Sequence, residues 1–151
     1  MQDTSPKTLS LYDTDFYAWA NQQAALLRAG RLGEADIANI AEEIESMGRS
    51  EKRELISQLA VLLMHLLKWR FQPGMRGKSW RLTIEVQRLE AAEHLADNPS
   101  LKSQMNEMLQ KAYRRARLEA ARETSHDSST FPASCPWSYD EIIDDTFWPE
   151  A

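Results

Sequence analysis

The sequence predicts an all-α protein, a single compact bundle of about five helices with a C-terminal tail packed on it. Apolar residues recur at the three- and four-residue spacing of amphipathic helices along most of the chain. No run of alternating apolar and polar residues competes with this pattern, and the breaks between helical stretches are short. At 151 residues the chain has the length of one domain, which we divide into an N-terminal segment (1–11), the helical bundle (12–123) and the tail (124–151).

Two helices are predicted before residue 50. The first begins near Asp13 or Thr14, because either side chain can cap a helix N-terminus, and it ends at Gly30. The second runs from about residue 33 to residue 47 and ends at Gly48, where glycine allows the left-handed backbone of a helix C-terminus. Its apolar face consists of Ile37, Ile40, Ala41, Ile44 and Met47.

The third predicted helix, over 50–71, is apolar nearly all round. One face holds Leu55, Leu59, Leu62, Leu63 and Leu66. Val61 and Met64 lie on another face. A helix of this kind either occupies a central position in its bundle or leaves one face for a partner.

Proline and glycine then break the helical pattern between Gln72 and Gly77. A fourth helix is predicted over 79–96 and a fifth from Ser100 onward. Because short connections join them, we expect the second helix to pack antiparallel to the third, and the fourth to the fifth.

The tail has two features that predict structure. Ser138 to Glu141 match the capping-box pattern, which predicts a short last helix before Ile142 and Ile143. Free tails seldom keep several large aromatic residues, so the aromatics of this segment indicate that the tail lies on the bundle. They are Phe131, Trp137, Phe147 and Trp148.

Composition restricts where the protein works. The single cysteine, Cys135, cannot form an intramolecular disulfide framework and suits a reducing compartment. The first residues lack the basic and apolar stretches of a secretory signal. The longest apolar stretch, from Leu55 to Leu67, falls short of the roughly 20 residues that cross a bilayer. We therefore expect a cytoplasmic protein with no membrane span.

The net charge of −5 argues against a general polyanion-binding protein. One stretch, over 68–81, nevertheless interleaves cations with aromatic residues, a pattern that can stack bases and neutralise phosphates. The alternative, which we favour, is that Trp69, Phe71 and Trp80 point into the core while the cations meet the acidic tail. The candidate residues of this stretch are Lys68, Trp69, Arg70, Arg76, Lys78, Trp80 and Arg81.

His65 is the other candidate, because it lies in the most apolar helix. Burial would suppress its charge, and an acid such as Glu42 or Glu45 would restore it; a core histidine with its hydrogen bonds satisfied is the favoured interpretation.

The motifs for nucleotide and metal binding are incomplete. Gly77-Lys78-Ser79 ends like a phosphate-binding loop, but Gln72 occupies the place of the first glycine. His65 and His94 lack the glutamate three residues earlier that di-iron bundles require. We expect no bound metal, no cofactor and no catalytic residue.

Several short motifs resemble a bacterial family catalogued as domain of unknown function 29. They are, in chain order, LYDTDFYAW, EEIESMGRSEK, LLMHLLKWRFQP, SWRLTI, PSL and ARETS, followed by FP and CP. The resemblance extends from about Leu11 to Pro149 and implies a compact helical fold of bacterial origin with no assigned activity. It therefore supplies no catalytic residues.

Two functions from different classes follow. The first is a non-enzymatic interaction or regulatory protein, which can form a homodimer through the face of the third helix that holds Val61 and Met64. The second is a nucleic-acid or polyanion-binding protein that uses the stretch 68–81, with the acidic tail as an intramolecular cover. An enzyme of unrecognised type is a more distant third interpretation.

Overall fold

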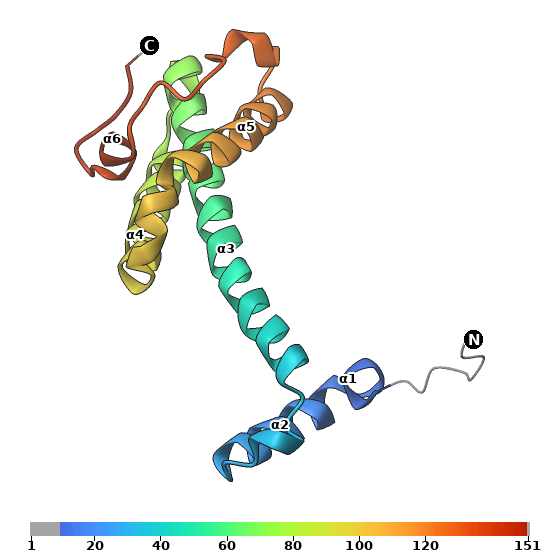
Figure 1. The fold of residues 1–151 in the computed structure, drawn as a ribbon. Coiled ribbons are helices and arrows are strands. Elements are labelled where there is room, and N and C mark those ends of the chain that lie inside the picture. The colour runs from blue at the N-terminus through green and yellow to red at the C-terminus, as the bar shows by residue number, and fades with distance from the viewer. Residues whose placement is uncertain (1–9, 151) are drawn as a thin grey trace. The chain divides into compact units, whose positions relative to one another are not determined.

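The computed structural model describes residues 10–150, and within that range every regular element is helical (Figure 1). The predicted all-α class is therefore confirmed. The α-helices are α1 (Leu11–Thr14), α2 (Phe16–Arg28), α3 (Ile37–Phe71), α4 (Lys78–Asp97), α5 (Met105–Glu123) and α6 (Tyr139–Ile143). Short 3-10 turns η1 (Leu32–Glu34), η2 (Pro73–Met75), η3 (Pro99–Gln104) and η4 (Ser128–Thr130) connect them. No described helix is both long enough and apolar enough to cross a membrane.

Contacts along the chain group it into two compact units, residues 1–49 and residues 50–151. Helix α3 begins in the first unit and ends in the second. The single domain expected from the length of the chain stays a prediction.

The first unit is held by polar contacts around Trp19 and Gln23, both of which are buried. The Trp19 indole Nε1 donates to the Asp36 carboxylate at 3.1 Å, and the Asp36 backbone N–H donates to the Gln23 side-chain oxygen at 2.7 Å. Gly30 has a φ of 71° and follows the end of α2, as predicted. The predicted helix start is wrong, because Asp15 ends α1 and its carboxylate caps α2 through the Ala18 N–H.

The largest correction concerns Gly48, which does not end a helix. Helix α3 runs through it without a break, so the two helices predicted over 33–47 and 50–71, and their antiparallel packing, are wrong. A glycine inside a helix lowers helix stability by only about 1 kcal/mol relative to alanine, and the residues on both sides of Gly48 favour the helical conformation. Arg49 also pairs with Glu42 at 2.9 Å and Glu45 at 3.8 Å, which adds support on either side of the glycine.

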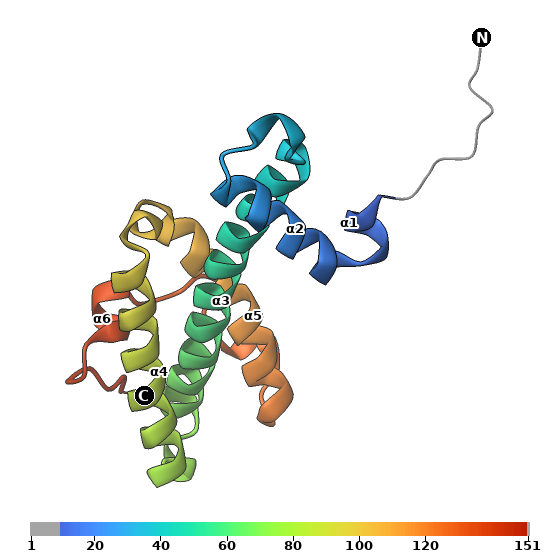
Figure 2. The same cartoon turned by 90° about the horizontal axis from the view of Figure 1, so that it is seen from below.

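The core of the second unit forms around the leucine face of α3. Leu55, Leu59, Leu62 and Leu66 are fully buried, and Val61 and Met64 are half-buried. Figure 2 shows α4 and α5 flanking this part of α3. The buried residues that α4 and α5 add to the core are Ile84, Ala91, Met105, Met108, Leu109, Ala112, Tyr113, Ala116 and Ala120.

The tail packs on this core, as its aromatic residues predicted. Phe131, Trp137 and Ile142 are buried in the same hydrophobic cluster. The predicted capping box is present: the Glu141 backbone N–H donates to the Ser138 hydroxyl at 3.2 Å, and the Ser138 N–H donates to the Glu141 carboxylate at 3.1 Å.

Arg88 of α4 binds the tail through its buried side chain. Its side chain is 1% exposed, and its guanidinium donates to the backbone carbonyls of Ile142 at 2.8 Å and Phe147 at 2.5 Å. The guanidinium also lies 5.1 Å from the ring centroid of Trp148. Burial lowers the pKa of Arg88, whereas the nearby carboxylates Asp145 and Asp144 act in the opposite direction.

We predict that Arg88→Met lowers the free energy of unfolding by about 2 to 4 kcal/mol, because it leaves one buried and one partly buried carbonyl without a donor. The tail should also become sensitive to protease before the bundle does. Urea unfolding and limited proteolysis measure the two effects. Arg81→Met is the control, since Arg81 is exposed and contacts the same Trp148 ring at 5.6 Å. Equal losses in the two variants would contradict the role of Arg88.

Candidate binding groove

A groove of about 830 Å³ lies between α5 and the tail of the second unit. This volume falls within the roughly 300 to 1,000 Å³ that is usual for ligand pockets. The side of the groove formed by α5 consists of Met105, Asn106, Leu109, Gln110, Tyr113, Arg114, Arg117 and Leu118. The side formed by the tail consists of Ala133, Ser134, Cys135, Trp137, Ser138 and Tyr139. No lining residue is acidic.

The floor of the groove is neutral and largely apolar. Tyr113 is buried, and its hydroxyl donates to the backbone carbonyl of Pro132. Burial raises the pKa of this hydroxyl to about 12. Burial likewise raises the pKa of the Cys135 thiol, which donates to the Trp137 carbonyl at 3.3 Å. Neither group is therefore charged near neutral pH.

Arg114 and Arg117 stand three residues apart on α5 and give the groove its positive charge. Neither has a carboxylate partner within residues 10–150. The Arg117 Nε is buried and has no hydrogen-bond partner among the described atoms. The charges of Arg117 and Arg70 oppose the rise in the pKa of the Tyr113 hydroxyl. Arg114 is exposed and Arg117 is half-buried, so the groove offers guanidinium groups that can pair with an anionic ligand.

The basic and aromatic stretch 68–81 interacts mainly with the chain itself. Four of its five cations lie over aromatic rings: Lys68 over Trp80, Arg70 over Phe71, Arg76 over Trp69 and Arg81 over Trp148. Lys78 is exposed.

Hydrogen bonds and ion pairs hold the same cations further. Lys68 pairs with Glu123 at 3.1 Å, and Arg81 pairs with Glu85 at 3.4 Å. The Arg76 guanidinium donates to the Trp69 carbonyl at 2.7 Å. Trp69 and Trp148 pack with their ring centroids 4.7 Å apart. These cations therefore contact rings, carbonyls and carboxylates of the same chain, and the tail contributes the Trp148 ring and the Pro149 carbonyl. The expected pairing of the cations with the acids of the tail stays a prediction.

His65 is half-buried and donates through Nδ1 to the Val61 carbonyl at 2.9 Å, since a carbonyl oxygen can only accept. Burial lowers its pKa, and Lys68 adds to that shift, whereas Glu123 opposes it. Glu42 and Glu45 are exposed residues of the first unit that pair with Arg49. The acid that acts on His65 is therefore Glu123, and neither of the two acids suggested by the sequence has a contact with this histidine.

No pattern in the sequence predicted the groove as a whole. The block of cations on α5 was visible in the sequence, and so was the spacing of Arg114, Arg117 and Leu118 on one side of that helix. The opposite wall was not visible, because it is an irregular segment whose path depends on tertiary packing. Cations on one helix with no acid three or four residues away are the signal that indicates the α5 side of the groove.

Comparison with family models identifies one family, described as Domain of unknown function DUF29, which matches residues 11–148. Searches of curated proteins and of solved structures give no match. The match covers nearly all of the 151 residues, so the chain belongs to the family described as Domain of unknown function DUF29.

Proposed function

We propose that this protein is a non-enzymatic interaction protein whose groove between α5 and the tail binds an acidic, partly apolar peptide segment of a partner protein. The observation that supports this most is the pair Arg114 and Arg117, which lack carboxylate partners in the described chain and border a neutral, apolar floor. We expect the protein to work in the bacterial cytoplasm, where its single thiol stays reduced.

The length of the groove favours a peptide over a small molecule. Its α5 wall extends from Met105 to Leu118, which corresponds to about 20 Å at the helical rise per residue. An extended peptide of about six residues has the same length. Leu118, which is 60% exposed, and Tyr139 offer apolar contacts at the rim.

The charge of the groove favours an acidic occupant. A guanidinium pairs with a carboxylate through two parallel hydrogen bonds, and the pair strengthens where water is excluded. Arg117 is half-buried, so its desolvation cost has already been paid during folding. A carboxylate that reaches it gains more than it would from an exposed arginine.

We predict that full-length protein will select acidic peptides with aliphatic or aromatic residues from a phage-displayed library of random twelve-residue peptides. Fluorescence anisotropy with a selected peptide then measures affinity. Arg114→Gln/Arg117→Gln should weaken binding at least about tenfold, because two charge-assisted contacts are lost. A bound peptide should also slow alkylation of Cys135, the only cysteine in the chain.

The matched control is Arg53→Gln/Lys102→Gln, which removes two exposed positive charges outside the groove. It should bind the selected peptide as the wild-type protein does. Selection of basic or uncharged peptides would overturn the proposal. Equal weakening in the two double variants, or unchanged alkylation of Cys135 with peptide bound, would overturn it as well.

Pairing of two copies through α3 is a second candidate interaction. The face expected to pair, that of Val61 and Met64, is half-buried. The large exposed apolar residues of α3 are instead Ile37, Ile44 and Met47, at 53%, 60% and 61% exposure. Their spacing of seven and three residues is that of a helix-pairing interface.

We predict that the wild-type protein sediments as a dimer at micromolar concentration and that Ile44→Glu sediments as a monomer. The substitution would place a carboxylate inside an apolar contact. Ala38→Glu adds the same charge at an exposed position about a third of a turn from Ile44 around the helix, and this variant should remain dimeric. A monomeric wild-type protein, or equal behaviour of the two variants, would exclude this dimer.

A further inference from the structure

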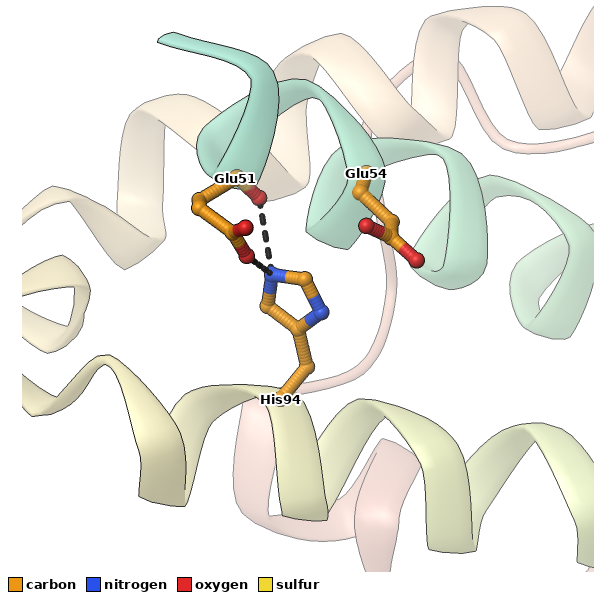
Figure 3. Close-up of side chains that lie close together, drawn as sticks. All are labelled: Glu51, Glu54 and His94. Atoms are coloured by element: carbon orange, nitrogen blue, oxygen red, sulfur yellow. Dashed lines mark hydrogen bonds and ion pairs between the residues drawn. The ribbon is translucent and has the colours of Figure 1, made fainter. Parts of the chain in front are cut away.

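Three potential metal ligands meet at one end of the second unit. Glu51 and Glu54 stand one turn apart on α3, and His94 is in the last turn of α4. Figure 3 shows the two carboxylates and the imidazole directed into the space between these helices. One ligand atom from each residue lies within 4.8 Å of the other two.

The imidazole is held in place before any ligand arrives. The His94 side chain is only 10% exposed, and its Nε2 lies 2.9 Å from the backbone oxygen of Glu51 and 3.1 Å from its carboxylate. Glu51 and Glu54 are exposed, so their carboxylates can turn. Because a carbonyl oxygen can only accept, Nε2 carries the proton of this hydrogen bond, and a metal ion that binds Nε2 must displace that proton. The site therefore combines one oriented imidazole with two adjustable carboxylates.

The charges around this cluster favour a cation. Within residues 10–150, neither Glu51 nor Glu54 has a lysine or arginine partner. The nearest lysine in sequence, Lys52, pairs instead with Glu107 at 3.2 Å. Two carboxylates thus share a small space with one imidazole, and no fixed positive charge of the described chain pairs with them.

We propose that Glu51, Glu54 and His94 form a binding site for a divalent metal ion of the zinc class. Zinc accepts imidazole nitrogen and carboxylate oxygen at about 2.0 to 2.2 Å, and three protein ligands leave a position for water. Ligand atoms that share such an ion lie about 3.4 Å apart in tetrahedral geometry. The three ligand atoms lie within 4.8 Å of one another, and the two carboxylates are exposed and so free to rotate toward that separation.

The proposed ion connects α3 to the end of α4. The folded chain holds its ligands together, whereas the unfolded chain separates residues 51 and 94 by a long loop. Metal binding therefore stabilises the folded state by mass action. This inference is independent of the peptide groove, whose lining contains none of these three residues.

Zinc chloride titrated calorimetrically into metal-free, full-length protein tests the site. We expect binding of one ion per chain and a rise in unfolding temperature with zinc concentration. Glu54→Gln should weaken the affinity at least about tenfold, and it should fold normally because Glu54 makes no ion pair in the described chain. His94→Gln should have the same effect and removes the only nitrogen ligand.

Glu90→Gln is the matched control, since it neutralises an exposed carboxylate of α4 outside the cluster. It should leave the affinity and the thermal shift unchanged. The absence of stoichiometric binding would overturn the proposal. Binding that persists in both Glu54→Gln and His94→Gln would also overturn it, because zinc would then be held by other groups such as His126 and Cys135.

Discussion

Burial of the leucine face of α3 is the constraint on which the second unit depends. Leu55, Leu59, Leu62 and Leu66 have no exposed surface, and burial of one leucine side chain contributes about 1.5 to 3 kcal/mol. Helices α4 and α5 cover this face, and the tail extends the same cluster. The positions of the groove wall on α5 and of His94 on α4 both follow from that packing.

Arg88 explains how an irregular tail becomes a fixed wall. Extended segments have backbone carbonyls that their own structure does not satisfy, and a buried guanidinium supplies several donors in one plane. By bonding the carbonyls of Ile142 and Phe147, Arg88 fixes the end of the tail, while Phe131 and Trp137 fix its middle in the core. The groove opens where the segment between these anchors passes α5.

Local patterns predicted much of the fold, because helical periodicity, the Ser138 capping box and the positive φ at Gly30 are determined within a few residues. The helix end predicted at Gly48 is wrong, because a glycine can either end a helix or be tolerated inside one. The residues on both sides of Gly48 continue the helix, and a local pattern does not show this. The groove and the Glu51, Glu54 and His94 cluster were missed for a different reason. Each joins segments far apart in the sequence, and no local spacing encodes which helix faces meet.

The candidate binding surfaces of this protein are distinguished by charged groups that lack a partner in the described chain, and not by the number of charged residues. The stretch 68–81 has the densest mixture of cations and aromatics, yet most of its cations contact rings or carboxylates of the same chain. Arg117 is less conspicuous in the sequence, but its half-buried guanidinium lacks such a partner in the described chain. A ligand that pairs with the guanidinium groups of Arg114 and Arg117 gains charge-assisted hydrogen bonds that folding did not provide. Binding is therefore expected where intramolecular pairing is incomplete, at the α5 groove and at the Glu51, Glu54 and His94 cluster.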